Sequence, residues 1–516
     1  MKHVLLSMIA VATPALADTD ASVEGSSGAA TPEDLDLRLT LSSFLYRETG
    51  DDVAPFVVDG SRVENASPVK RYFGDLRIEL TDDGLALDAR VRQTTSQRFQ
   101  SGADGTSEYE LRALAYRFGS ARTSLTLGRQ YIDSVGATKI DGLAAHRRLA
   151  DPIGATLFVG LFPALGSRSV ETDYPRFVQS DGAEGPRLLP LTGGLGIDYQ
   201  HGDYHGAIGV AGVYVAQNLP DATSDEKSRV FTTSTGYWRP ISVLDVYHFV
   251  LLDVAGQNGV ALTNGSAGLV LRPASALQVS ASFTHVGIDV LQIATRNLFE
   301  DPDPAVDGLV RNDVSLVRVS QDAARAGASL ALAARRFEIS ASAGVHRRPA
   351  VTVPLSGTGG DLTFSETRSI DATFGILDRR SIGGLRISLA GTLAFPFGSA
   401  VPNRARSTSA RLAIGRPFAR ERGQLDLDAM GGRFSTSGST EMCVTFTDVF
   451  DCYSATKATV AQAGVIASWR IGREWLLVAD AHAGYRDATS QTIAGATVWP
   501  HVYSITSFLR AQWRYH

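Results

Sequence analysis

The alternation of polar and apolar residues, repeated from Leu35 to the end of the chain, is the feature that most limits what this sequence can fold into. Within 35–45, the leucines at 35, 37, 39, 41 and 45 share one face, and Asp36, Arg38 and Thr40 lie on the other. Successive side chains of a β-strand point to opposite faces, so a period of two predicts strands. The same pattern recurs at 76–80, 85–92, 277–284, 337–344 and 477–485. We therefore expect an all-β chain, with one short helix at 289–300 as the exception.

The segments that join these expected strands fall into two length classes. Short turns occur at 82–84, 119–122, 201–203, 272–275 and 471–474, whereas long segments rich in Gly, Ser, Asp and Pro occur at 49–70, 163–191, 287–311, 347–366 and 435–455. Short and long connections broadly alternate, as in outer-membrane barrels with short periplasmic turns and long external loops. The sequence thus predicts a transmembrane antiparallel up-and-down β-barrel with an even number of strands, 18 to 22. The strand count is hardest to assign at 312–335: this region contains two strands or one long strand, or the segment before it enters the lumen.

The N-terminus indicates export. Lys2 and His3 precede an apolar run at 4–12, and Ala15-Leu16-Ala17 has the small residues that signal peptidase reads. We expect a signal peptide at 1–17, a flexible mature N-terminus at 18–34 and a barrel at 35–516. After residue 17 the sequence has no run of about 18 apolar residues, so it predicts no membrane-spanning helix. The expected location is the outer membrane of a Gram-negative bacterium, with outer-membrane lipid around the barrel.

The charge balance argues against nucleic acid as a partner. The formal net charge is −5, and only five lysines occur. A chain of this charge has no bulk attraction to a polyanion.

Charged side chains on the polar parity of the strands are the candidate pore-lining residues. They carry both signs and are Asp36, Arg38, Asp75, Arg77, Glu79, Asp88, Arg90, Arg92, Asp426, Asp428, Arg510 and Arg514. One interpretation is a set of cross-strand ion pairs that keep a polar lumen in shape. The other is a transverse field that orients hydrated, hydroxyl-rich solutes. In both cases the mixed charge argues against strong selection of anions or cations.

Two cysteines lie in one long external segment. Cys443 and Cys452 are nine positions apart in an exported chain, so we expect a loop disulfide between them.

The sequence lacks the common short motifs for catalysis, metal binding and cofactor binding. The chain has no GxxxxGK loop, no HExxH, no GxSxG and no CxxC. We therefore expect no catalytic residue, no metal, no cofactor and no enzymatic activity. An outer-membrane enzyme remains the alternative, and it would require polar side chains that converge at one rim.

One segment resembles a known family. Residues 125–149 contain Gly128-Arg129-Gln130 followed by Ile140-Asp141-Gly142. This pair is similar to a strand pair of the alginate-export type of outer-membrane porin and of other exopolysaccharide-export barrels. The resemblance implies a monomeric barrel that exports a polysaccharide with periplasmic and inner-membrane machinery. Arg129 falls on the apolar parity of its strand unless Gly128 marks a bulge.

Three functions follow from these observations. The leading hypothesis is passive export of a secreted polysaccharide, the second is a general diffusion or uptake porin for small hydrophilic solutes, and the third is a barrel enzyme or adhesin. An export channel should have no tight constriction that folds inward. A diffusion porin should have one loop folded into the lumen, and an enzyme should have a cluster of polar side chains at its rim.

Overall fold

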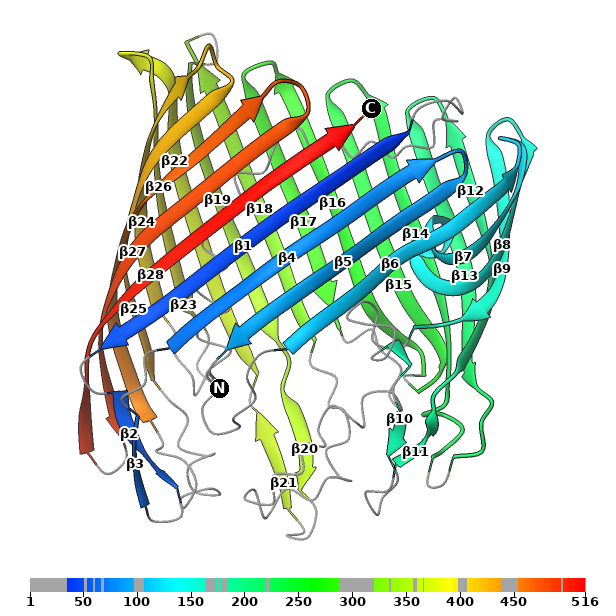
Figure 1. Cartoon of the computed structure of the whole chain (residues 1–516), viewed down its shortest axis with the longest axis horizontal. Helices are drawn as coiled ribbons and strands as arrows, with labels where there is room; N and C mark the ends of the chain where they lie inside the picture. The colour runs from blue at the N-terminus through cyan, green and yellow to red at the C-terminus, as the bar shows by residue number, and fades with distance from the viewer. Residues whose placement is uncertain are drawn as a thin grey trace.

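The chain forms a closed antiparallel barrel of 22 strands (Figure 1). The computed structural model describes residues 35–50, 53–58, 61–65, 69–96, 106–163, 173–174, 176–178, 184–219, 222–257, 259–287, 320–333, 336–355, 360–364, 366–397, 406–437, 453–492 and 495–515. The expected signal peptide, the flexible N-terminus, the helix at 289–300 and both cysteines lie outside these residues. Those expectations remain predictions.

The strands and the one short 3₁₀ turn have the following bounds: β1 (Asp36–Gly50), β2 (Val53–Val58), β3 (Ser61–Asn65), β4 (Val69–Asp82), β5 (Leu85–Ser96), β6 (Thr106–Gly119), β7 (Thr123–Ile132), η1 (Asp133–Val135), β8 (Thr138–Ala150), β9 (Ile153–Leu161), β10 (Arg176–Val178), β11 (Glu184–Arg187), β12 (Pro190–His201), β13 (Tyr204–Val215), β14 (Ser228–Ile241), β15 (Leu244–Gly256), β16 (Ala261–Ala274), β17 (Leu277–Val286), β18 (Gln321–Leu332), β19 (Phe337–Arg348), β20 (Val351–Leu355), β21 (Gly360–Phe364), β22 (Thr367–Ile382), β23 (Leu385–Pro396), β24 (Arg406–Phe418), β25 (Gly423–Ser437), β26 (Tyr453–Ile471), β27 (Trp475–Thr492) and β28 (Gly495–Tyr515).

Each wall strand pairs with its neighbours in sequence, and β28 pairs with β1 to close the ring. Three small hairpins, β2–β3, β10–β11 and β20–β21, lie outside the wall at the end where the long connections are (Figure 1). Closure satisfies the backbone hydrogen bonds that an open sheet would leave exposed at its edges, which a bilayer requires. The predicted fold class is confirmed, and the strand number is the upper value of the predicted range. In the ambiguous segment, β18 is one strand that begins at Gln321.

The outer face of the wall is apolar. Exposed residues such as Leu41, Leu76, Val91 and Leu509 alternate with polar residues on the same strands. The aromatic residues Phe418, Trp469, Trp475 and Trp513 lie beside short turns at the same end of the barrel. Aromatic side chains at that level are typical of a membrane interface. No helix in the described ranges is long and apolar enough to cross a membrane.

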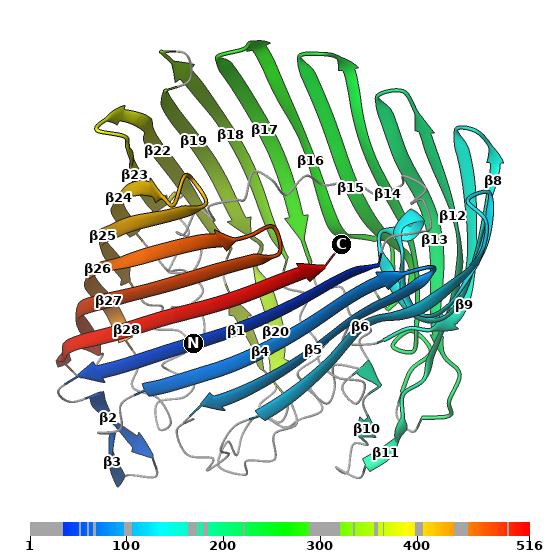
Figure 2. The same cartoon turned by 45° about the horizontal axis from the view of Figure 1, so that its top comes forward.

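The two ends of the barrel differ as the loop lengths predict. The turns at 82–84, 119–122, 201–203, 272–275 and 471–474 all lie at the end where the C-terminus is marked (Figure 2). The wall is uneven in length, since β26 to β28 have 18 to 21 residues and β7 and β9 have only 10 and 9.

Candidate functional site: the lumen and an inward hairpin

A ladder of charged side chains crosses the inner face of β1, β4 and β5. Arg77 donates to both carboxylate oxygens of Asp88 at 2.9 and 2.8 Å and lies 3.0 Å from Glu79. Arg90 bonds to Asp75, and Arg92 lies 3.5 Å from the same carboxylate. These residues lie on the strand face opposite the exposed leucines, so they point into the barrel. Opposite charges stand next to one another across strands, as cross-strand pairing favours.

The remaining candidate pore residues extend this pattern around the wall. Arg38 lies 3.8 Å from Glu79, and Arg514 donates to Asp36 at 2.9 and 3.1 Å. On β25, Asp426 accepts from Arg386 at 3.2 Å, and Asp428 accepts from Arg411 at 2.8 and 3.0 Å.

Two features of the wall were not part of the sequence-based expectation. His482 lies 3.3 Å from Asp428. Arg510 lies over the ring of Phe508 at 5.3 Å instead of facing a carboxylate of the described residues.

Residues 130–140 leave the wall and fold inward. The pairing of β6 with β7 ends at Arg129, and the pairing of β8 with β9 begins at Asp141. Between these points, β7 and β8 pair only with each other. The bend occurs at Gly128, whose φ is +122°, and at its partner Gly142. A Cβ on either glycine would overlap a backbone oxygen of the next strand. Only glycine fits this bend, because other residues rarely adopt such a φ.

The tip of the hairpin packs on the inner face of the adjacent wall. Val135 is fully buried, and η1 contacts β12, β13 and β14. A side chain at Gly196 or Gly209 would collide with η1, and Gly136 lies against Thr233 and Phe249. In Figure 2 the short coil of η1 lies within the ring of strands, beside β13. The tip therefore occupies part of the lumen.

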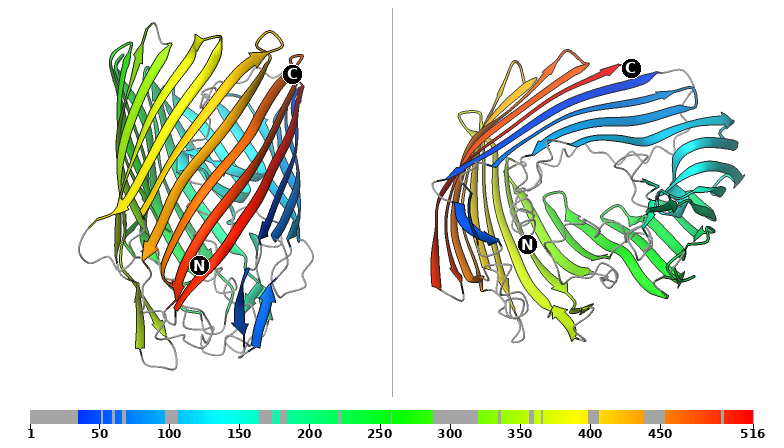
Figure 3. Two further views of the ribbon diagram at one scale, coloured as in Figure 1. Left: turned by 90° about the vertical axis from the view of Figure 1, so that its left-hand side faces the viewer. Right: turned by 60° about the horizontal axis from the view of Figure 1, so that its bottom comes forward.

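A second segment covers the tip. Phe177 and Leu188, from the connection between β9 and β12, are fully buried and join Ile132, Ile140 and Val135 in one apolar cluster. The β10–β11 hairpin of this connection lies at the end with the long loops, below the cyan strands (Figure 1), and Figure 3 shows that end of the barrel from two further sides. The cluster replaces a water-filled lumen with a packed core on this side of the barrel.

A buried ion network fastens the covering segment to the hairpin. Arg129 donates to both oxygens of Asp141 at 2.6 and 2.5 Å and to Asp173 at 2.7 Å. Arg129 is 5% exposed, and Asp173 is fully buried. Tyr174 donates to Asp141. Burial and this hydrogen bond raise the pKa of the Tyr174 hydroxyl above its ordinary value, so it stays protonated and keeps donating.

The bend also explains the parity of Arg129. The residue falls on the apolar parity of β7, and the strand pairing shows no register shift at Gly128. The chain instead turns inward at Gly128, so the side of the hairpin that would face lipid faces the covering segment.

The sequence analysis did not predict the inward hairpin, although the sequence of β13 contains a signal for it. A lumen-facing strand should alternate, but β13 is apolar on both faces. Ala211, Val213 and Val215 are buried on its inner face, while Val210 and Tyr214 are exposed on the outer face. A strand that is apolar on both sides is typical of one covered on both sides.

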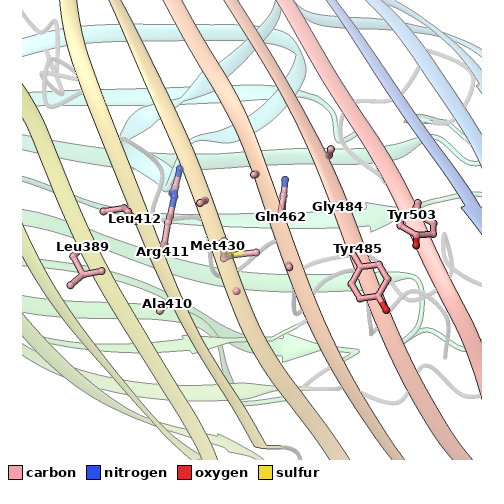
Figure 4. A pocket seen from close by; sticks show the side chains of 14 residues that line it. Leu389, Ala410, Arg411, Leu412, Met430, Gln462, Gly484, Tyr485 and Tyr503 are labelled. Atoms are coloured by element: carbon pink, nitrogen blue, oxygen red, sulfur yellow. The ribbon is translucent and has the colours of Figure 1, made fainter.

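One open groove lies on the outer, lipid-facing side of the wall. This groove, about 550 Å³, runs across β23 to β28 (Figure 4). Alanines form its floor, Leu389 and Leu412 one side, and Tyr485 and Tyr503 the other. Its apolar lining suits hydrocarbon, so it is not the solute site. Among the described residues, no group of three His, Cys, Asp or Glu is placed to hold a metal.

Closed antiparallel strands, an apolar outer face and a charged inner face define the class: the chain is an outer-membrane β-barrel of a Gram-negative bacterium. No protein-family model matches it, and no curated protein does either.

Solved structures that match over nearly the whole chain include OccAB2 of Acinetobacter baumannii, at 10% identity and a TM-score of 0.39, covering 94% of this chain and 98% of that one. OccD3 (OpdP) of Pseudomonas aeruginosa matches at 10% identity and a TM-score of 0.34, covering 95% and 94%. OmpT, an outer membrane protein of Vibrio cholerae, matches at 12% identity and 0.31, covering 93% and 99%. Likeness at this level carries no conclusion about what the chain does.

One expectation of the sequence analysis is corrected. The sequence analysis excludes an enzyme because short catalytic motifs are absent, but none of the matched structures, OmpT and the Occ proteins included, is similar enough to support that exclusion. The exclusion is therefore withdrawn. Its physical basis was weak, because catalytic side chains on a barrel converge in space from distant strands and need no local motif.

Proposed function

We propose that this barrel is a diffusion or uptake channel for small hydrophilic solutes. The inward hairpin carries the proposal, since residues 130–140 occupy part of the lumen and are held there by a buried core and a buried ion network. A fixed obstruction narrows the bore, which hinders a bulky polymer more than a small hydrated molecule. The charged inner face supports this, because paired Arg and Asp groups exchange hydrogen bonds with a passing solute.

Polysaccharide export is less well supported. An export channel for a polymer should lack a constriction that folds inward. The residues that resemble the alginate-export type, Gly128 to Gln130 and Ile140 to Gly142, form the base of the bend itself. The same residues therefore contribute to narrowing the lumen.

A deletion strain separates the two functions. We expect loss of the gene to slow entry of a small sugar or amino acid and to leave every surface polysaccharide in place. A complemented strain should recover the rate of entry. If the deletion removes a surface polysaccharide and leaves small-solute entry unchanged, the proposal is wrong and the export hypothesis replaces it.

A further inference from the structure

Three phenylalanines form a row on the inner face where the barrel closes. Phe508 of β28 is the register partner of Phe44 of β1, which in turn is the partner of Phe73 of β4. The rings of Phe44 and Phe73 are stacked, with centroids 4.9 Å apart and planes 21° from parallel. All three side chains are half-buried. The row therefore keeps apolar ring surface in contact with the lumen.

This position is unusual for an apolar side chain. Phe44 follows Asp36, Arg38 and Thr40 on the polar parity of β1, and the ladder of ion pairs lies on the same face. Apolar surface in contact with water costs free energy in proportion to its area. The hairpin core does not explain the row, because that core is built from other strands.

An arginine lies over each end of the row. The guanidinium of Arg510 is 5.3 Å from the ring centroid of Phe508, and that of Arg92 is 5.4 Å from the centroid of Phe73. Both arginines belong to the adjacent register row, which runs from Arg510 through Ser42 and Asp75 to Arg92. The ring beneath each guanidinium holds it by a cation–π contact.

The two arginines differ in their acidic partners. Arg92 lies 3.5 Å from Asp75, and that carboxylate also takes a bond from Arg90. Arg510 is exposed and makes no ion pair with a carboxylate of the described residues. A guanidinium without an acidic partner, fixed on an aromatic ring, offers its N–H groups to an anion in the lumen.

We propose that Phe508, Phe44, Phe73 and Arg510 form a binding site for small aromatic carboxylates. The aromatic ring of the solute stacks on the row, and its carboxylate accepts hydrogen bonds from Arg510. A neutral sugar would stack on the rings but give Arg510 no anionic partner. An aliphatic acid would pair with Arg510 but leave the phenylalanine rings in contact with water. This inference rests on the proposed function, because the site faces the lumen of a channel.

Block of the ion current by benzoate tests the site. The purified barrel is inserted in planar bilayers, and benzoate, cyclohexanecarboxylate, acetate and benzyl alcohol are titrated against the single-channel current. We expect benzoate to block at a concentration roughly tenfold below that of the other three, since it alone satisfies both the rings and the cation. Equal block by benzoate and cyclohexanecarboxylate would overturn the aromatic part, and equal block by benzoate and acetate would overturn the site.

Variants assign the contacts. Arg510→Gln should raise the blocking concentration of benzoate roughly tenfold, the change expected for a charge-assisted hydrogen bond, and Arg510→Lys should restore part of the block. Phe508→Leu should weaken the block by benzoate and leave the block by acetate unchanged. Arg514→Gln is the matched control, because Arg514 lies on the same face of β28 but is paired with Asp36. Wild-type block in the folded Arg510→Gln barrel, judged by heat-modifiable migration, would contradict the proposal.

The same recording separates this inference from the proposed function. A wild-type barrel that inserts but carries no current would overturn both. A barrel that conducts and does not discriminate among the four solutes would overturn the binding site alone.

Discussion

Arg129 links the covering segment to the inward hairpin. It lies 5% exposed between Asp141 and Asp173, and so joins β8 to the covering segment. Arg129→Met removes the cation that the buried Asp173 shares with the half-buried Asp141, and leaves Asp173 with the more distant Lys139 at 3.8 Å. Removal of one partner of a buried pair costs about 3 to 5 kcal/mol. We expect the covering segment to detach while the wall, which has its own ladder of hydrogen bonds, stays intact.

Limited trypsin digestion measures this detachment. Cleavage after Arg176 or Arg187 should be faster in Arg129→Met than in wild type, with heat-modifiable migration unchanged. Arg411→Met is the matched control, since it removes a lumenal arginine paired with Asp428 on a distant strand. Equal cleavage in all three proteins would mean that the ion network does not hold the segment.

At the scale of elements, the bend at Gly128 determines where the β7–β8 hairpin goes. Gly128→Val places a side chain against the backbone of Leu114 and requires an unfavourable φ. We expect the hairpin to leave its packed position and the single-channel conductance to rise at least about twofold, because the lumen widens where the tip was. Gly212→Ala in β13 is the control, since nothing lies within 4 Å of its added Cβ. An unchanged conductance in folded Gly128→Val would contradict the constriction.

The strands themselves could be predicted from the sequence, and the hairpin could not. Leu76, Ile78 and Leu80 alternate with charged residues because one face meets lipid and the other water, so local sequence is enough to place them. The inward bend depends on contacts between Val135 and wall strands some 60 to 100 positions later in the chain, which no local pattern encodes.

Part of the candidate site could likewise be predicted from the sequence, and part could not. Parity alone placed Asp75, Arg77 and Asp88 on one face. Local sequence could not predict the ion network of Arg129 or the pairing of Phe44 with Phe508. Both follow only once the strand register is known. Closure of β28 on β1 brings the two ends of the chain together, and only the fold reveals which residues then meet.

For the whole molecule, the two ends of the barrel should face different compartments. The short turn at Gly84 follows β4 at one end of the barrel, and β25 ends at Ser437, just before Gly438, at the other end. We expect an epitope inserted at Gly438 to be labelled on intact cells and one at Gly84 to be labelled only after the outer membrane is permeabilised. Surface labelling at Gly84 would reverse the orientation.

Solute entry into vesicles tests the central claim, a narrowed channel for small solutes, most directly. Purified barrel is reconstituted in liposomes, and swelling is recorded in isosmotic arabinose, a disaccharide, a trisaccharide and a long dextran. We predict rapid swelling with arabinose, a steep fall with solute size and no entry of dextran, with the fall less steep in folded Gly128→Val. No swelling with arabinose, or entry of dextran at a comparable rate, would contradict the account.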